Sequence, residues 1–131
     1  MDAERSSVAS GDAVQAALAR DRTIDITTTG RRSGQQRRIE IWSYYVDGRV
    51  YLSGSPGRRD WYANLLANSD FVFHLKRSVQ ADLPARARPI TDPAERRAIV
   101  ARIFEVLGPF GDVEAWVARS PLVEVDLSAA A

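Results

Sequence analysis

The sequence predicts an α+β fold: a small barrel of about six mostly antiparallel strands with helices packed outside it. Short segments in which apolar and polar residues alternate recur along the chain, as expected of half-buried strands. Asp47-Gly48, between two such segments, is a strong signal for a two-residue hairpin. Helix starts interrupt the strands, and the plainest is Thr91-Asp92-Pro93, a capping residue followed by proline in the first turn.

The first half of the chain predicts one helix and three strands of an antiparallel meander. Ser10-Gly11-Asp12 offers N-cap chemistry for a short helix over residues 10–20, which follows a loose N-terminus at residues 1–9. Alternating apolar residues then predict strands that are separated by glycine-containing turns. These strands span residues 23–29, 37–46 and 49–53.

The second half predicts three helices and three further strands. Asp60 is expected to cap a helix over residues 61–68, whose apolar side chains face the core. Those side chains are Trp61, Leu65 and Leu66. The helix that opens at Pro93 is expected to end near Leu107, before Gly108-Pro109. The last helix spans residues 112–119, and the strands span residues 71–75, 79–90 and 122–127.

No repeat, low-complexity tract or linker interrupts these elements. We therefore expect a single domain over residues 1–131, with the barrel at residues 23–127. A barrel of this size fills its own interior with side chains, so a ligand is expected on its outside or at a subunit seam.

Composition excludes several classes of function. The chain is 45% hydrophobic and 27% charged, as in ordinary globular proteins, and its net charge of +1 creates no global attraction to nucleic acid or membranes. It has no cysteine, which excludes disulfides and thiolate chemistry. The single histidine, His74, has no partner at ligand spacing, so we expect no metal site and a structural role for His74.

The sequence also bears on localisation. No apolar segment approaches the roughly 20 residues needed to cross a bilayer. The N-terminus lacks the apolar core of a signal peptide. We therefore expect a cytoplasmic protein, and peripheral contact with a membrane stays open.

Two turns rich in glycine and arginine are the candidate site. The first spans residues 27–38, with Gly30 and Gly34 among hydroxyl and arginine side chains, and the second spans residues 53–60. Guanidinium groups are suited to bidentate contact with phosphate or carboxylate. The two turns therefore suggest two walls of one anion site. The alternative is a pair of solvated hairpin turns.

An ordered combination of short motifs resembles the deazaflavin-dependent nitroreductase and quinone reductase family. The motifs are TTGRRSG at residues 28–34, Arg37, Asp47-Gly48, SGS at residues 53–55, WYANL at residues 61–65 and Ala67-Asn68. The resemblance covers about Ile24 to Val125. It implies a split β-barrel, similar to the pyridoxamine-phosphate-oxidase and flavin-reductase barrels. It also implies an oxidoreductase that passes a hydride from reduced coenzyme F-420 to a quinone, a nitro compound or another activated hydrophobic acceptor.

The same resemblance implies where the coenzyme binds. Three segments match coenzyme-binding segments of the family. The first holds the phosphodiester and polyglutamate arm, the second meets the deazaflavin ring, and the third lies at the start of the following helix. Their residues are Arg31, Arg32, Ser33, Arg37, Arg38, Ile39, Glu40, Ile41 and Trp42 in the first; Ser53, Gly54, Ser55 and Pro56 in the second; and Asp60, Trp61, Tyr62, Ala63 and Asn64 in the third. Core packing is the alternative role for the side chains of Trp61 and Leu65.

The acceptor is expected to stack over the deazaflavin, and a tyrosine or solvent to supply a proton. The residues that we expect to bound the acceptor are Trp42, Tyr44, Phe110 and Trp116, and the candidate catalytic residues are Tyr44 and Tyr62. The family's nitroimidazole-reducing members carry tyrosines ahead of the final helix, where this chain offers Leu107, Phe110 and Val113. A phenol that could donate a proton is therefore missing there.

Further departures lie in or next to the two turns. Arg32 stands where the family usually has lysine, Glu40 where proline is common, and Pro56 where the nitroimidazole-reducing members have lysine. The loop between Gly57 and Trp61 is several residues shorter than in those members. The carboxylate of Glu40 could pair with Arg38 or weaken anion binding.

Other functions of the same residues stay open. One is a non-catalytic or FMN-dependent member of the fold that binds a lipophilic ligand such as a fatty acid; a single phosphate would need fewer arginines than the two turns carry. Nucleic-acid binding would require aromatic residues among the arginines, and neither turn has one, so we expect a small-molecule partner and no nucleic acid. Monomer and homodimer both remain open.

Overall fold

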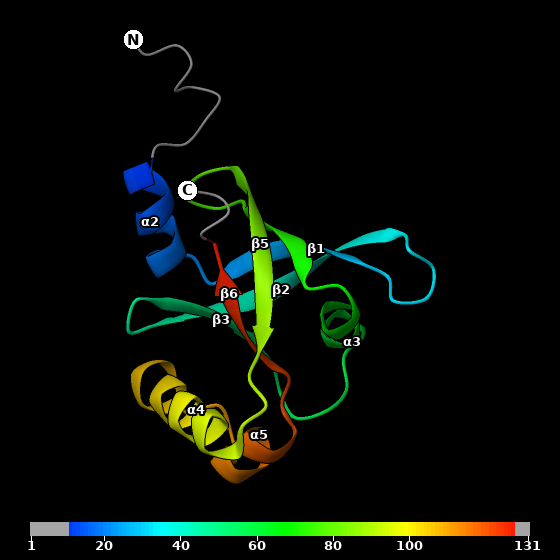
Figure 1. The fold of residues 1–131 in the computed structure, drawn as a ribbon. Helices are drawn as coiled ribbons and strands as arrows, with labels where there is room; N and C mark the ends of the chain where they lie inside the picture. Colours follow the sequence, from blue (N-terminus) through cyan, green and yellow to red (C-terminus); the bar gives the residue numbers. More distant parts are fainter. Residues whose placement is uncertain (1–10, 128–131) are drawn as a thin grey trace, which may run out of the picture.

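The computed structural model describes residues 11–127 and shows a closed barrel of six strands with helices on its outside (Figure 1). The strands are β1 (Thr23–Thr29), β2 (Gln36–Val46), β3 (Arg49–Ser53), β4 (Asp70–Leu75), β5 (Ala81–Pro89) and β6 (Leu122–Asp126). Their order around the barrel is β1-β2-β3-β6-β5-β4, and every pairing is antiparallel. The predicted α+β barrel is confirmed.

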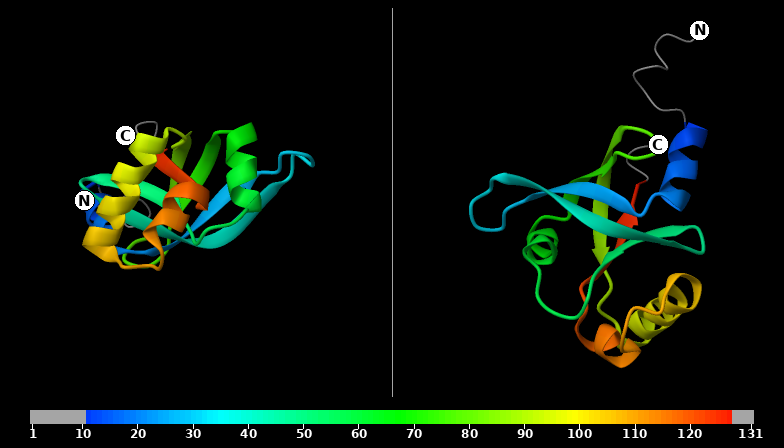
Figure 2. Two further views of the ribbon diagram at one scale, coloured as in Figure 1. Left: turned by 90° about the horizontal axis from the view of Figure 1, so that it is seen from below. Right: turned by 180° about the vertical axis from the view of Figure 1, so that it is seen from behind.

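Within the described residues, four helices lie on the outside of the barrel. They are α2 (Gly11–Arg20), α3 (Asp60–Ala67), α4 (Pro93–Leu107) and α5 (Val113–Arg119). Figure 2 shows α4 and α5 together at the end of the barrel opposite α2, with α3 beside the long β1–β2 hairpin. This arrangement leaves α3 and α5 on either side of one stretch of β2, where the candidate site lies.

Apolar side chains form two clusters. The first fills the barrel and includes Ile24, Ile26, Leu52 and Phe73, all of which are fully buried. The second lies between the outer face of β2 and β3 and the helices α4 and α5. Its members include Tyr44, Tyr51, Val100, Ile103 and Trp116. The alternation in β2 therefore serves two cores, one on each face of the strand.

The structure corrects the predicted start and face of α3. Arg59, not Asp60, is the N-cap residue, since its backbone is extended (φ −139°, ψ 137°), and Asp60 is the first helical residue. Among residues 11–127, no side chain makes a capping hydrogen bond to the start of this helix. The prediction that Leu66 faces the core is also wrong, because that side chain is 52% exposed, whereas Trp61 and Leu65 are buried as expected.

The other element boundaries within the described residues agree with the prediction to within two residues. The fifth strand begins at Ala81, so Val79 lies before it, and the last strand ends at Asp126. The start of α4 has the expected chemistry, because the side chain of Asp92 accepts a hydrogen bond from the backbone N–H of Glu95. In α5, Asp112 is the N-cap and not the first helical residue, and its side chain accepts from the backbone N–H of Glu114. Residues 1–10, including the predicted cap at Ser10, lie outside the described residues.

His74 occupies a structural position. It lies in β4, only 6% exposed, with both ring nitrogens hydrogen-bonded. Its Nε2 is 2.7 Å from Oγ1 of Thr27 and its Nδ1 is 2.7 Å from Oδ1 of Asp82. These contacts hold β4 against its neighbours β1 and β5.

Candidate functional site

The site begins where β2 loses one of its two neighbours. Residues 36–42 pair with β1, but β3 pairs only with residues 43–46. The backbone N–H of Ser43 donates to the carbonyl of Arg22 in the β1 direction (2.8 Å). Because successive residues of a strand direct their N–H and C=O groups to opposite sides, the main chains of Glu40 and Trp42 face away from β1. They are open to a ligand.

A cavity of about 480 Å³ lies along this open edge. Its volume is in the range of pockets that hold organic ligands. We call it the aromatic cavity, and its lining residues come from β2, from the end of β3 and the loop after it, and from α3, α5 and the loop before α5. They are Ile39, Glu40, Ile41, Trp42, Tyr44, Ser53, Gly54, Ser55, Arg59, Trp61, Phe110 and Trp116.

The aromatic rings of this cavity are packed edge to face or tilted. Phe110 lies 5.7 Å from Tyr44 and 5.8 Å from Trp116, measured between ring centroids. Trp116 and Tyr44 are buried, whereas Trp42 is 49% exposed at the cavity. The rings form a firm apolar wall against which a flat ligand can stack.

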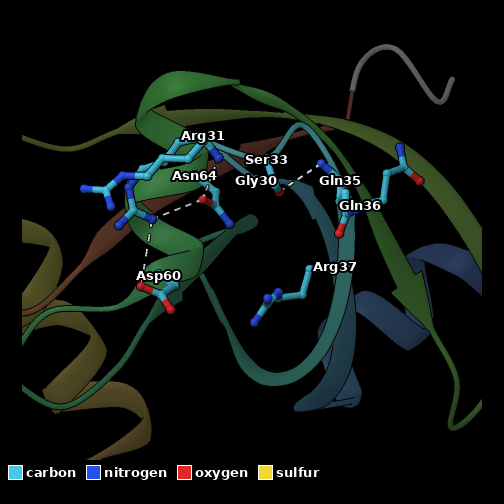
Figure 3. Close-up of a pocket in the computed structure, with 9 residues that line it drawn as sticks. Gly30, Arg31, Ser33, Gln35, Gln36, Arg37, Asp60 and Asn64 are labelled. Atoms are coloured by element: carbon cyan, nitrogen blue, oxygen red, sulfur yellow. Dashed lines mark hydrogen bonds and ion pairs between the residues drawn. The ribbon is translucent and has the colours of Figure 1, made fainter.

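A second cavity, of about 260 Å³, is shown in Figure 3. We call it the arginine cavity, and its residues come from the β1–β2 turn, the start of β2 and the start of α3. They are Gly30, Arg31, Arg32, Ser33, Gln35, Gln36, Arg37, Asp60 and Asn64. The two cavities adjoin in the sequence, since Arg59 and Trp61 line one and Asp60 lines the other.

Asn64 fixes the arginine turn to α3. This buried amide accepts from the backbone N–H of Arg31 (3.1 Å) and from its Nη1 (3.4 Å), and its own Nδ2 donates to Oγ1 of Thr28 (3.2 Å). Gly30 allows the turn to close, because a Cβ there would meet Oγ of Ser33 at 2.6 Å. Gly34 has a positive φ of 72°, which glycine adopts without strain. The turn therefore presents its arginines from a fixed backbone.

Charge in the arginine cavity is largely uncompensated. Arg31 makes one long ion pair with Asp60 (3.8 Å). Among the described residues, Arg32 and Arg37 have no ion-pair partner, and Figure 3 shows Arg37 directed into the space enclosed by the turn and α3. Exposed arginines without partners, above a fixed turn, suit an anion with more than one charge.

Arg38 and Glu40 are engaged on the outer face of the barrel. Nε of Arg38 donates to Asp25 (2.9 Å), and Glu40 pairs with Nζ of Lys76 (2.5 Å), not with Arg38. Burial works to raise the pKa of Asp25, but hydrogen bonds from Lys76 and Arg38 hold it below its usual value. The hydrogen bonds to Asp25 and Glu40 raise the pKa of Lys76. Glu40 is thus neutralised by a lysine, which removes its repulsion of a nearby anion.

Tyr44 is the phenol that the structure brings to the aromatic cavity. It is only 4% exposed, and burial raises its pKa above 10 although the charge of Arg22 opposes the shift. Tyr62 instead packs edge to face on Trp61, against the barrel core, and lines neither cavity.

Comparison with known proteins decides the family. A family model described as F420H(2)-dependent quinone reductase matches residues 3–128, almost the whole chain. The chain belongs to this family. It is an oxidoreductase that uses coenzyme F-420, and the resemblance seen in the sequence is confirmed.

Solved structures similar to this reductase share its fold at low identity. A conserved hypothetical protein of Mycobacterium tuberculosis is 18% identical over 92% of this chain and 82% of its own, with a TM-score of 0.70. An F420-H2 dependent reductase is 23% identical over 81% and 95%, with a TM-score of 0.61. A pyridoxamine 5'-phosphate oxidase of Listeria innocua is 10% identical over 89% and 92%, with a TM-score of 0.63. The split-barrel fold is therefore confirmed.

The residues of the two cavities fit the coenzyme. Its phosphodiester and carboxylates need several cations, which the arginine cavity offers, and its flat ring needs an apolar slot with main-chain donors and acceptors, which the aromatic cavity offers. Direct contact with the coenzyme stays a prediction for the residues that line the two cavities. The expected residues that line neither cavity are Arg38, Pro56, Tyr62 and Ala63.

Several residues that line the cavities lie in the two candidate turns but were given no role in coenzyme binding. Gln36 begins β2 and Gln35 precedes it, and both line the arginine cavity. Arg59 lines the aromatic cavity. For Arg59, the available signal was its position in the second turn, one residue before Asp60. Its placement depends on Arg59, and not Asp60, being the N-cap of α3.

Replacing Asn64 with alanine is expected to raise the dissociation constant for the coenzyme about tenfold and to cost about 1 to 3 kcal/mol of unfolding free energy, since buried partners lose their hydrogen bonds. Titration with the coenzyme and denaturant unfolding measure the two effects. The matched control is Asn68→Ala, at the exposed end of the same helix. Equal behaviour of the two variants would contradict the anchoring role of Asn64.

Proposed function

We propose that this reductase transfers a hydride from reduced coenzyme F-420 to a hydrophobic quinone or nitroaromatic acceptor that binds in the aromatic cavity. The observation that carries the proposal is the adjoining pair of cavities along one stretch of β2. Gln36 and Arg37 line the arginine cavity, and Ile39 to Trp42 line the aromatic cavity. This stretch spans about 20 Å at 3.4 Å per residue. That length suits a ligand with an anionic arm at one end and a flat ring at the other.

The coenzyme supplies the hydride, and the protein supplies binding, orientation and exclusion of water. Arg31, Arg32 and Arg37 hold the anionic arm. The open main chain of Glu40 and Trp42 and the loop at residues 53–55 hold the ring. Phe110 and Trp116 cover the acceptor, and the apolar wall keeps water from the reacting atoms.

Tyr44 is the proposed proton donor to the reduced acceptor. Because burial raises its pKa, the phenol stays protonated throughout the pH range below 10 and can donate a proton at neutral pH. Tyr44→Phe is expected to lower kcat by about tenfold to a hundredfold, since a positioned acid contributes about that much or more. In this variant, solvent can supply the proton for the remaining turnover.

The control is Tyr45→Phe, at the next position of β2, whose side chain packs against the barrel core. Steady-state kinetics at pH values from 6 to below 10, a range set by the reference pKa of tyrosine of about 10, provide the measurement. An unchanged kcat in Tyr44→Phe would assign the proton to solvent or to another group.

The test of the proposed function is turnover with defined acceptors. The purified protein is mixed anaerobically with reduced coenzyme F-420 and either a quinone or a nitroarene, and oxidation of the coenzyme is followed by absorbance. Saturable turnover with at least one of the two classes is expected. Coenzyme binding without turnover of either class would contradict the proposed acceptors.

The expected compartment is also retained as a proposal. Among the helices of residues 11–127, none is both long and apolar enough to span a bilayer. The coenzyme and the proposed chemistry suit the cytoplasm, which cell fractionation of the source organism would test.

A further inference from the structure

The aromatic cavity contains one cationic side chain whose charge is not compensated. Of the described residues that line it, Arg59 alone carries a positive charge and Glu40 alone a negative one. Glu40 is paired with Lys76. Among the ion pairs of residues 11–127, none includes Arg59. The cavity is therefore electropositive at Arg59, although its other walls are apolar or neutral.

The position of the Arg59 guanidinium is fixed by its own loop. Its Nη2 donates to the carbonyl of Ser55 (2.9 Å) and its Nη1 to that of Arg58 (3.1 Å). The guanidinium also lies close to the backbone of this loop, since a Cβ built on Gly57 would be 3.2 Å from Nη1. A guanidinium has five N–H donors, so three are left after these two bonds. A fixed cation with free donors at the wall of a cavity that also carries aromatic rings is preorganised to bind negative charge.

The reaction creates negative charge in this cavity. Hydride transfer breaks one C–H bond of the reduced coenzyme and forms one bond to the acceptor. It oxidises the coenzyme and reduces the acceptor by two electrons each. The electron pair displaced within the acceptor comes to rest on a quinone or nitro oxygen, which then takes a proton from Tyr44 or solvent, while the oxidised ring releases its own proton to solvent. That oxygen needs a hydrogen-bond donor before it is protonated.

We propose that Arg59 is a catalytic residue, which binds the acceptor oxygen on which negative charge develops and so selects acceptors with a carbonyl or nitro oxygen. The inference rests on the proposed function, because it requires the acceptor to lie in the aromatic cavity. Arg59 supplies the electrophilic contact that the apolar residues before α5 do not.

The test compares Arg59→Gln and Arg59→Lys with the matched control Arg58→Gln, which removes an exposed arginine that lines neither cavity. Removal of one donor to a developing oxyanion typically lowers kcat by about 100-fold to 1,000-fold. Arg59→Gln is therefore expected to lower kcat by about 100-fold, with the dissociation constant of the coenzyme changed less than about threefold. Arg59→Lys should retain part of the activity.

Two further readouts separate this role from a structural one. Across a series of quinones of rising reduction potential, the loss in Arg59→Gln should shrink, because electron-poor acceptors stabilise their own charge. In Arg59→Ala, added guanidinium at millimolar concentration should restore part of kcat, whereas sodium at equal ionic strength should not. Thermal unfolding of each variant identifies any that fails to fold. If Arg59→Ala fails to fold, the role of Arg59 is judged from kcat of Arg59→Gln and Arg59→Lys and from the quinone series.

The failures are distinguishable. Absence of turnover by the wild-type protein would overturn the proposed function, and this inference with it. Wild-type turnover with kcat of Arg59→Gln within threefold of wild type would overturn only the role of Arg59. A higher dissociation constant for the coenzyme at unchanged kcat would also overturn it, because Arg59 would then serve coenzyme binding.

Discussion

Replacing both Arg32 and Arg37 with alanine is expected to raise the dissociation constant for coenzyme F-420 by 100-fold or more. Both side chains line the arginine cavity, and neither has an ion-pair partner among residues 11–127. A hydrogen bond to a charged group contributes about 1.5 to 3 kcal/mol, so two lost contacts account for at least this change. Quenching of tryptophan fluorescence by the coenzyme provides the measurement, since Trp42 and Trp61 line the adjoining cavity.

The matched control is Arg38→Ala. Arg38 lies next to Arg37 in β2, but its guanidinium is bound to Asp25 and it lines neither cavity. Its removal should change the affinity less than threefold at physiological salt, a difference equivalent to about 0.7 kcal/mol. An equal loss of affinity in Arg38→Ala and the double variant would contradict specific contacts from Arg32 and Arg37. Coenzyme affinity would then depend only on the overall charge of the hairpin.

Replacing Arg96 with alanine is expected to cost about 3 to 5 kcal/mol of unfolding free energy, because it leaves several carbonyls without their donors. The guanidinium of Arg96, in α4, donates to the carbonyls of Ile90 (2.8 Å), Val117 (2.7 Å), Trp116 (3.3 Å) and Ser120 (2.6 Å). It therefore joins the end of β5, the C-terminal turn of α5 and the chain that enters β6. Urea unfolding followed by circular dichroism measures the loss.

Arg97→Ala is the control for this prediction, since Arg97 lies on the same helix and, within the described part of the chain, pairs only with exposed Glu114. A solvent-exposed pair contributes about 0 to 1 kcal/mol. Comparable stability of the two variants would mean that solvent satisfies the carbonyls of α5 as well as Arg96 does. Because Trp116 lines the aromatic cavity, Arg96→Ala is also expected to weaken the acceptor wall.

Much of the fold follows from local sequence signals. The alternation of Ile24 and Ile26, the Asp47-Gly48 turn and the capping residues Asp92 and Asp112 each act within a few residues of the chain, so they can be recognised without a partner segment. The predicted N-cap at Asp60 was wrong, because a residue type that favours the N-cap position can also occupy the first turn of a helix. The extended backbone of Arg59 places the helix start one residue earlier.

The candidate site was predicted less completely, for a different reason. Arg31 to Arg37 are close in sequence, so their shared turn could be foreseen. The partners of Arg38 and Glu40 could not, because Asp25 and Lys76 reach them through strand pairing between β1, β2 and β4. The open edge of β2 likewise depends on where β3 stops pairing, which no local pattern encodes.

The central claim is that the paired cavities bind coenzyme F-420, and it is tested most directly by titration of the purified wild-type protein. Tryptophan fluorescence is followed during addition of the coenzyme, with FMN and a long-chain fatty acid titrated in parallel. Saturable binding of coenzyme F-420, tighter than that of either alternative and weakened in Arg37→Ala, is the predicted result. Binding of FMN or the fatty acid without binding of coenzyme F-420 would contradict the account.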